Sequence, residues 1–417
     1  MQICAQNTHP GNCRVLMIAP TPFFADRGCH VRILEEARAL QSLGHEVTIV
    51  TYHNGQDVPG IRIVRIPHIP WYKKLEAGPS VHKYYLDQLL LAKAAAQALR
   101  LKPDVLHGHL HEGALVARAV SLVRRVPVVM DCQGSLTDEL VAHRFLKRGG
   151  MHFRIMKAVE RAVVRSADAV IVSSSRTGAF LVDDLGAEPR RVHVVHDGAD
   201  TSIFRPDRDA SHVRRAWGIP PDAPLVVYMG ALTRYQGIDH LLEAAPYVLA
   251  RHPEARFLIC GYPEGQYQAR VREAGLAHRV IFPGRISYFD TPDYLAAAHI
   301  GVAPKLETTE ANGKVYYYMA SGLPTVVFDQ PINRDMLGEL GVYARMGDAS
   351  SLAEQICLLL DNPDLMRRLS VQVRQRAVER YSWTAAASKI IRVYESLTGR
   401  PYPTAPSARE DMLTARR

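Results

Sequence analysis

The stretch Asn312-Gly313-Lys314-Val315-Tyr316-Tyr317-Tyr318-Met319-Ala320-Ser321-Gly322-Leu323-Pro324 places a loop, a short helix and the approach to a strand in one continuous segment. Asn312 is a favourable helix N-cap, and Gly322 with Pro324 ends the helix. The apolar run at residues 325–328 that follows has the composition of a buried strand. A helix that leads directly into a buried strand is typical of a parallel α/β protein.

The start of this helix is also a candidate anion site. Its free N–H groups carry partial positive charge, Gly313 lets a ligand approach the backbone, and Lys314 adds a full charge in the first turn. The pattern therefore predicts a helix start that faces a phosphate, such as that of a nucleoside diphosphate. The alternative is an ordinary crossover, because most loop-to-helix junctions in parallel-sheet proteins bind nothing.

Length and composition indicate two soluble domains. The chain has 417 residues, 47% of them hydrophobic and 22% charged, and two domains of this size can each bury a core. No apolar run approaches the roughly 20 residues that cross a bilayer. Residues 1–13 lack a basic segment followed by an apolar core, so we expect a disordered leader and a cytoplasmic protein, for which the inner face of the membrane is an alternative place.

Cysteine usage and charge narrow the chemistry. The six cysteines contain no C-x-x-C pair, which favours reduced thiols over a disulfide framework or a zinc knuckle. The net charge of +9 favours anionic partners, among which nucleotide sugars, acidic lipid headgroups and nucleic acid all qualify. Because the basic residues are scattered and no nucleic-acid motif is visible, we expect no nucleic-acid partner.

Two series of strand-like and helical patterns follow each other along the chain. The first series has apolar runs at residues 15–19, 47–51, 105–107, 128–130 and 170–172, with a helical pattern at residues 28–43. The second series has apolar runs at residues 225–229, 256–260, 280–282, 300–303 and 325–328, with a helical pattern at residues 237–250. Such alternation predicts two Rossmann-like, doubly wound α/β domains facing each other across a cleft that binds the ligands.

The expected boundaries follow from these series. The N-terminal domain is predicted at residues 14–205 and the C-terminal domain at residues 206–382, after the turn signals at Asp197-Gly198 and Phe204-Arg205-Pro206. A helix at residues 383–400 is expected to return to the N-terminal domain, and residues 401–417 form a polar tail.

Several motifs resemble the retaining glycosyltransferases of the GT-B fold, specifically family 4. They are Tyr228-Met229-Gly230, Gly237-Ile238-Asp239, Leu241-Leu242-Glu243-Ala244, the segment at residues 318–324, and Tyr381-Ser382-Trp383. The resemblance covers nearly the whole chain. It implies transfer of a sugar from a nucleoside diphosphate sugar to an acceptor with retained configuration and without a tightly bound metal or other cofactor.

The chemistry of such a transfer agrees with the residues. Departure of the diphosphate builds negative charge, which helix N-termini and fixed cations stabilise. The predicted donor-binding residues are therefore Gly28, Gly230, Arg234, Lys305, Glu310, Asn312, Gly313, Lys314 and Tyr317. Arg234, Lys314 and Gln133 are the predicted catalytic residues.

The chain departs from the family pattern at several of these positions. Ala231 and Gln236 stand where the family has an Arg and a Lys, so Arg234 is expected to contact the phosphates instead, the alternative being a solvated surface arginine. The family's paired glutamates fall at Thr309, beside Glu310, and at Tyr317. Gln133 lies in the segment where many members have a His, and Cys29 replaces a glycine.

Two further groups of residues have alternative interpretations. His107, His109 and His111 alternate after a strand and could bind zinc, but the preferred interpretation is no metal, with His109 and His111 contacting the acceptor. Trp71, Lys73 and Lys74 interleave aromatic and basic residues on a predicted loop. This pattern predicts contact with a glycan or lipid-linked acceptor, or with an anionic membrane, and the alternative is a packed interdomain loop.

The sequence thus predicts a transferase that moves a sugar from a UDP- or GDP-linked donor onto a glycan, glycolipid or other cell-envelope acceptor. A nucleotide-sugar epimerase, a phosphorylase of the same fold and a non-catalytic nucleotide-sugar or glycan binder remain alternatives.

Overall fold

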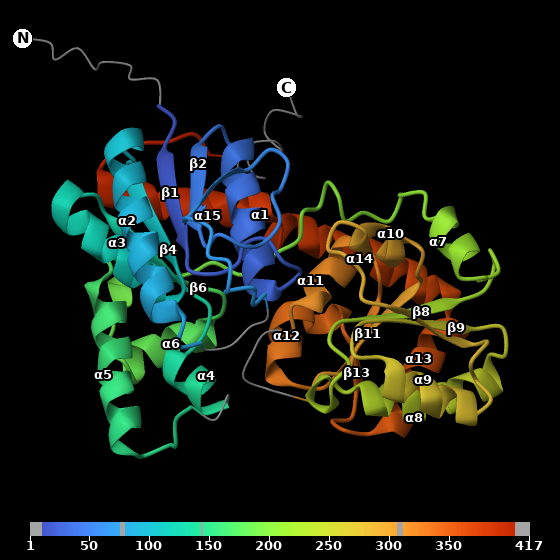
Figure 1. Cartoon of the computed structure of the whole chain (residues 1–417). Helices are drawn as coiled ribbons and strands as arrows, with labels where there is room; N and C mark the ends of the chain where they lie inside the picture. Colours follow the sequence, from blue (N-terminus) through green and yellow to red (C-terminus); the bar gives the residue numbers. More distant parts are fainter. Residues whose placement is uncertain (1–10, 76–79, 143–144, 307–311, 405–417) are drawn as a thin grey trace, which may run out of the picture. The chain divides into compact units, whose positions relative to one another are not determined.

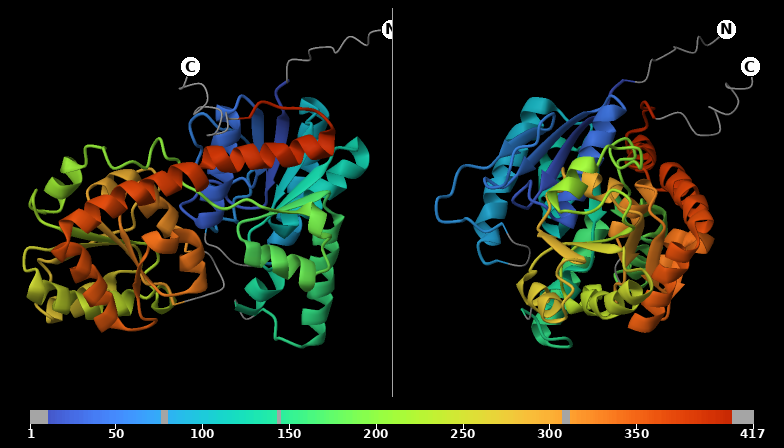
Figure 2. Two further views of the ribbon diagram at one scale, coloured as in Figure 1. Left: turned by 180° about the vertical axis from the view of Figure 1, so that it is seen from behind. Right: turned by 90° about the vertical axis from the view of Figure 1, so that its right-hand side faces the viewer.

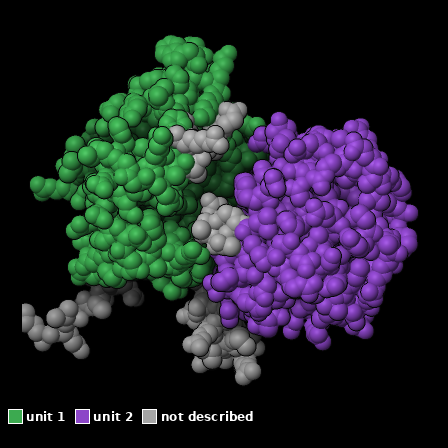
Figure 3. All heavy atoms as spheres, turned by 90° about the horizontal axis from the view of Figure 1, so that it is seen from below, with its two compact units in different colours: residues 1–196, 383–417 green, residues 197–382 purple. Residues whose placement is uncertain are grey.

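The computed structural model describes residues 11–75, 80–142, 145–306 and 312–404. The chain forms two compact units: Met1–His196 with Trp383–Arg417 is unit 1, and Asp197–Ser382 is unit 2 (Figure 3). Unit 2 begins before the expected boundary at residue 206, because Ala199 N donates to Tyr381 O (2.9 Å) and Phe204 packs in the core of unit 2.

Unit 1 is built on a seven-stranded parallel sheet of order β3-β2-β1-β4-β5-β6-β7 (Figure 1). Its strands are β1 (Arg14–Ala19), β2 (Glu46–Thr51), β3 (Arg62–Arg65), β4 (Val105–His109), β5 (Val128–Cys132), β6 (Ala169–Val172) and β7 (Val192–Val194). Both faces of β1, β4, β5 and β6 are buried, which explains why these strands are almost continuous apolar runs.

The helices of unit 1 cover both faces of this sheet. They are α1 (Gly28–Ser42), α2 (Lys83–Leu101), α3 (Leu110–Arg124), α4 (Leu136–Ala142), α5 (Met151–Ser166), α6 (Ser175–Asp183), η1 (Pro189–Arg191) and α15 (Trp383–Thr398). Helix α15 packs on α1, whereas α2 packs on α3 and α3 on α5. Figure 2 shows α15, in red, lying across one face of the sheet. The last helix therefore completes the core of unit 1.

Unit 2 has a six-stranded parallel sheet of order β10-β9-β8-β11-β12-β13 and one continuous hydrophobic core. Its strands are β8 (Leu225–Met229), β9 (Arg256–Cys260), β10 (Val280–Gly284), β11 (Ile300–Ala303), β12 (Thr325–Phe328) and β13 (Val342–Ala344). Its helices are α7 (Ser211–Ala216), η2 (Arg234–Gln236), α8 (Ile238–Arg251), α9 (Gly265–Glu273), α10 (Thr291–Ala296), α11 (Lys314–Ala320), α12 (Pro331–Leu337), η3 (Gly338–Leu340), α13 (Ala349–Asp361) and α14 (Pro363–Arg380).

The predicted fold class is confirmed, since each unit is a doubly wound parallel α/β sheet. In each sheet the chain order reverses beside the first strand, between β1 and β4 in unit 1 and between β8 and β11 in unit 2. Ligands of such sheets bind at this reversal, outside the carboxyl ends of the strands. The two reversals therefore fix where functional residues should be sought.

The described chain ends are more ordered than expected. Cys13 is fully buried and its carbonyl accepts from Glu46 N (2.9 Å). Tyr402 is buried as well, and His45 Nε2 lies 3.0 Å from Pro403 O. The expected disordered leader and polar tail therefore include residues that pack on unit 1. Among the helices of the described ranges, none has the length and apolar character needed to cross a bilayer.

Candidate active site

The reversal in unit 2 brings together three backbone segments around one lysine. Lys314, the first residue of α11, donates from Nζ to Gln236 Oε1 (2.8 Å) in η2. The same Nζ lies 4.4 Å from the ring centroid of Tyr228 in β8. A Cβ on Gly230, whose φ is 140°, would stand 3.1 Å from this amine. The end of β8, the turn η2 and the start of α11 thus enclose the amine of Lys314.

Two further glycines show how closely these loops approach one another. A Cβ on Gly237 would stand 1.8 Å from Pro304 O, at the end of β11. A Cβ on Gly261, after β9, would stand 1.9 Å from Gly230 O. Any larger residue would clash with backbone at either position, so glycine is required for the carboxyl edge to close around Lys314.

Two lysines give this edge its charge. Lys305 and Lys314 are the only lysines in the sequence of unit 2. Lys305 is buried and Lys314 is half-buried at this edge. Burial, followed by repulsion from Lys305, lowers the pKa of Lys314 to about 7. Within the described residues, Lys314 makes no ion pair. An anion bound here would restore the full charge of this amine.

Asn312 does not cap α11 as predicted. Its side-chain Nδ2 donates to Ala303 O (3.1 Å) and lies 3.4 Å from Asn333 Oδ1, while the N-cap position is occupied by Gly313. The buried amide of Asn312 therefore donates to a carbonyl at the end of β11 and not to the start of the helix. Asn312 therefore fixes the loop to β11.

The other predicted donor residues occupy different environments. Arg234 is exposed at the start of η2, and a Cβ on Gly313 would meet nothing within 4 Å. Tyr317 packs its ring against Phe204, with centroids 4.8 Å apart, in a small aromatic cluster. Glu310 lies outside the described residues.

The reversal in unit 1 begins with the exposed Gly28 at the start of α1. A Cβ on Gly28 would meet nothing within 4 Å, so this backbone is open on that side. His30, the third residue of α1, contacts Thr21 Oγ1 through Nε2 and the backbone of Ala25 through Nδ1. Burial lowers the pKa of His30 to about 4, so the ring is neutral and holds the loop that follows β1.

Below this loop lies a buried charged network that sequence reasoning missed. Arg32 Nε lies 3.0 Å from both oxygens of Asp131, and Arg32 NH2 lies 2.8 Å from Oδ1. Asp131 Oδ2 also contacts His109 Nδ1 (3.1 Å) and accepts from Gln133 Nε2 (2.8 Å). Burial opposes ionisation of Asp131, but Arg32 and His109 bring its pKa well below the usual range. Asp131 is therefore a buried carboxylate that orients His109 and Gln133.

A second arm of the network reaches α15. Arg32 NH2 lies 3.0 Å from Glu36 Oε1, and His107 Nδ1 lies 2.6 Å from the hydroxyl of Tyr394. Glu36, His107 and His109 offer three potential metal-ligand atoms within 4.8 Å of one another. The guanidinium of Arg32 already supplies a positive charge to Glu36, so the network is balanced mainly by an internal cation. The zinc trio considered from the sequence is not formed, because His111 lies elsewhere.

The expected loop position of the histidines is wrong. Strand β4 extends to His109 and α3 begins at the next residue, so His107 and His109 are buried in the sheet. His111 is also buried, with Nε2 3.7 Å from Glu160 Oε1. Neither His109 nor His111 reaches the surface as a residue contacting an acceptor would.

The aromatic and basic segment is only partly exposed. Trp71 is 73% exposed and Lys73 is exposed, whereas Tyr72 is buried and Lys74 is half-buried. Trp71 Nε1 donates to Tyr85 OH (3.2 Å), which ties the segment to α2. Trp71 and Lys73 remain available for contact.

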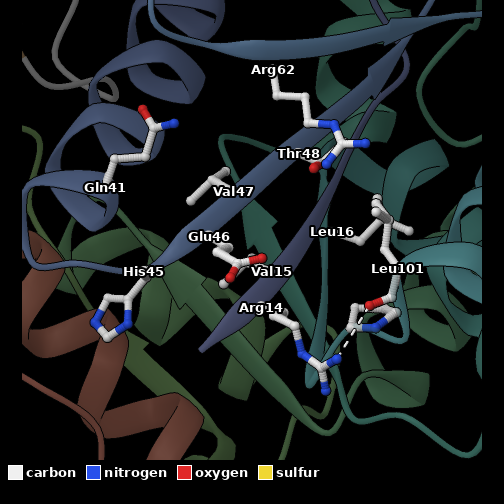
Figure 4. Close-up of a pocket in the computed structure, with 11 residues that line it drawn as sticks. Arg14, Val15, Leu16, Gln41, His45, Glu46, Val47, Thr48, Arg62 and Leu101 are labelled. Atoms are coloured by element: carbon white, nitrogen blue, oxygen red, sulfur yellow. Dashed lines mark hydrogen bonds between the residues drawn. The ribbon is translucent and has the colours of Figure 1, made fainter. Parts of the chain in front are cut away.

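A cavity of about 280 Å³ lies at the opposite edge of the first sheet (Figure 4). Arg14 and Val15 at the start of β1, Glu46 and Thr48 of β2, and Arg62 line it. These are amino ends of parallel strands, where doubly wound sheets do not bind their ligands. We therefore do not assign it to the active site.

Comparison with models of protein families shows to which family this chain belongs. Residues 27–198 match the model of a glycosyl transferase 4-like domain, and residues 223–362 match that of the glycosyl transferases group 1. The chain belongs to the family 4 glycosyltransferases. The first match lies in unit 1 up to residue 196, and the second lies wholly in unit 2, so both units are family domains.

Several named glycosyltransferases are similar to this family 4 glycosyltransferase over most of its length. Sulfoquinovosyl transferase SQD2 of Arabidopsis thaliana is 25% identical over 90% of this chain and 72% of its own. The D-inositol 3-phosphate glycosyltransferase of Thermobispora bispora is 28% identical over 91% of this chain and 92% of its own. Anabaena HepE, solved with UDP and glucose, superposes with a TM-score of 0.72 at 15% identity, covering 93% of this chain and 100% of its own. This structural likeness confirms the GT-B fold of the family 4 glycosyltransferase.

Proposed function

We propose that this glycosyltransferase moves a sugar from a UDP- or GDP-linked donor onto a glycan, glycolipid or other cell-envelope acceptor, with retention and without a tightly bound metal. The observation that carries the proposal is Lys314 at the carboxyl edge of unit 2, a half-buried amine that makes no ion pair among the described residues and lies near the buried Lys305. A partly desolvated amine of this kind favours a bound anion, and a diphosphate supplies one.

In the reaction, the bond between the anomeric carbon and the diphosphate oxygen breaks while the acceptor oxygen bonds to the same face of that carbon. The acceptor proton passes to the departing diphosphate. Lys314 would stabilise the charge that develops on this leaving group, with Lys305 and the exposed Arg234 assisting. Gly230 and Gly313 would allow the phosphates to approach the backbone.

In unit 1, we propose that Gly28 and Gln133 serve the sugar and its acceptor. Gly28 leaves open backbone at the start of α1, and Gln133 is half-buried and anchored to Asp131 (2.8 Å). Such anchoring pre-organises an amide for hydrogen bonds to a hydroxyl. The UDP in HepE and the D-inositol 3-phosphate in the name of the Thermobispora relative favour a UDP-sugar and a polyol phosphate acceptor as first trials.

The test is the melting temperature of the protein with UDP, GDP, ADP, TDP and CMP and their sugar conjugates. Binding to the folded state raises the free energy of unfolding, by about 2.7 kcal/mol when the ligand concentration is a hundred times Kd, and so raises the melting temperature. We expect one nucleotide family to stabilise wild type and not Lys314→Ala. Arg272→Ala, an exposed cation on α9, is the matched control and should respond like wild type.

A product assay completes the test. Appearance of free nucleoside diphosphate that depends on an acceptor supports transfer. Interconversion of the donor without an acceptor would indicate an epimerase, a requirement for inorganic phosphate would indicate a phosphorylase, and unchanged bound donor would indicate a non-catalytic binder. The anomeric configuration of the product, measured by NMR, decides retention.

A further inference from the structure

Helix α5 exposes an apolar row that no described element covers. Met151, Ile155 and Val159 are 69%, 53% and 42% exposed. They are spaced four residues apart and so lie along one face of the helix. A helix on the surface of a soluble domain usually presents polar side chains on its outer face. The outer face of α5 is therefore unusual and needs a partner.

The opposite, inner face of α5 is also apolar and packs in the core of unit 1. The exposed apolar row is therefore separate from the face that the helix buries. Val163 and Val164 are buried in the core of unit 1, and Glu160 on that side accepts from Leu136 N (2.7 Å) and Thr137 Oγ1 (2.6 Å). These contacts fix the rotation of the helix about its axis. The outward position of Met151, Ile155 and Val159 is thus set by packing.

A basic row runs beside the apolar one. Arg154, Arg161 and Arg165 are exposed and are spaced seven and four residues apart, which places them on an adjacent strip of the helix. The only acidic residue within α5, Glu160, is buried, and Asp184 nearby lies 3.8 Å from Lys157. The outer face therefore combines apolar and positive surface with little negative charge.

From this surface we infer that α5 docks unit 1 on an anionic lipid bilayer. An interfacial helix buries its apolar row at the headgroup boundary while flanking cations contact acidic headgroups. The positive row argues for a lipid surface over an uncharged apolar partner, and the net charge of +9 acts in the same direction. This surface is distinct from the segment around Trp71 and independent of the proposed reaction.

The test is co-sedimentation of the full chain with vesicles of phosphatidylcholine alone or with one quarter phosphatidylglycerol. Wild type should bind only the anionic vesicles and be released by salt. Combined Met151→Ser, Ile155→Ser and Val159→Ser should weaken binding at least about tenfold. Combined Arg154→Gln, Arg161→Gln and Arg165→Gln should do the same at low salt.

A control locates the effect. Val371→Ser with Val378→Ser changes exposed apolar residues of α14 in unit 2. This variant should bind like wild type. The α5 variants should keep the wild-type melting temperature and its response to UDP, which separates this inference from the proposed function.

Three results would overturn the inference. The first is wild type that remains in the supernatant with every vesicle, and the second is α5 variants that bind as tightly as wild type. The third is a wild-type dimer in sedimentation velocity that the serine variant dissociates, which would assign the face to a second copy of this chain.

Discussion

The two sheet reversals differ in how the charge of a cation is compensated. In unit 1, Arg32 is enclosed by Asp131 and Glu36, so its charge is compensated within the protein. In unit 2, Lys314 is half-buried and faces an amide, an aromatic ring and a second lysine. A compensated ion pair serves the fold, whereas an amine without an ion-pair partner among the described residues, such as Lys314, is a site for a ligand that brings the missing negative charge.

This contrast predicts its largest effect at Asp131. Asp131→Asn should destabilise the protein by about 3–5 kcal/mol, because Arg32 loses its main partner while remaining buried. Urea denaturation would measure the free energy of unfolding. Asp138→Asn is the matched control, since Asp138 pairs with Arg148 (2.7 Å) at the surface and should cost less than about 1 kcal/mol. Equal losses in both variants would remove the distinction between the two regions.

The second effect is on catalysis. Lys314→Met should lower kcat/KM about a hundred- to thousandfold, because a cation that stabilises the leaving group is removed. Unlike Asp131→Asn, it should not lower the stability of the free protein near pH 7, since it removes a partly desolvated amine that has no ion-pair partner among the described residues. Steady-state kinetics with the donor found by the nucleotide panel, together with urea denaturation, would measure both. A fully active variant would exclude Lys314 from the reaction.

A third effect is the pH dependence of nucleotide binding. The pKa of Lys314 is about 7 in the free protein, and a bound diphosphate should raise it. Affinity for UDP should therefore be highest below pH 7 and fall by up to about tenfold per pH unit above it. Isothermal titration calorimetry would measure this, and Lys314→Met should lose that slope. A slope unchanged in the variant would assign the pH dependence to another group.

The same group affects stability in the opposite sense. In the unfolded chain Lys314 has its ordinary pKa of 10.5, so between pH 7 and 10.5 the unfolded state binds more protons than the free folded state. The contribution of Lys314 to the free energy of unfolding therefore rises with pH across this window. Saturating UDP should reduce this rise, because the bound anion keeps the lysine protonated.

The smallest expected effect is at Arg234. This guanidinium is exposed, and water and salt screen the attraction between exposed charges. Arg234→Ala should therefore weaken donor binding only a few-fold. The apparent KM for the donor measures it. A loss as large as that of Lys314→Met would show that Arg234 becomes buried against the donor in the complex.

The alternating apolar runs were sufficient to predict the architecture. Strands β8, β9, β11 and β12 have the predicted bounds, because buried parallel strands are apolar on both faces and cannot be confused with loops. Strands β3, β7 and β13 were missed. They are edge strands of only three or four residues, which is too short to give a clear periodic signal.

The site was less predictable for a different reason. Lys314 is identified by its place in the motif, but Arg32 and Asp131 are 99 residues apart in the sequence and meet only in the folded unit. Two signals were available, namely the charged i,i+4 pair Arg32 and Glu36 within an apolar helix and the acid at the end of the run that forms β5. Their partners depend on tertiary contacts that no local pattern encodes.

The order in which the chain is made also bears on unit 1. Unit 2 is a continuous segment, so all six of its strands are available once residue 382 has been synthesised. Unit 1 needs α15, because Tyr394 contacts His107 (2.6 Å) and Tyr402 packs near His45. During translation the N-terminal half must therefore wait, with part of its core open, until the C-terminal helix leaves the ribosome. A nascent chain arrested before residue 383 should expose this apolar surface to chaperones. All seven strands of the first sheet have been synthesised by then, because the last of them, β7, ends at Val194.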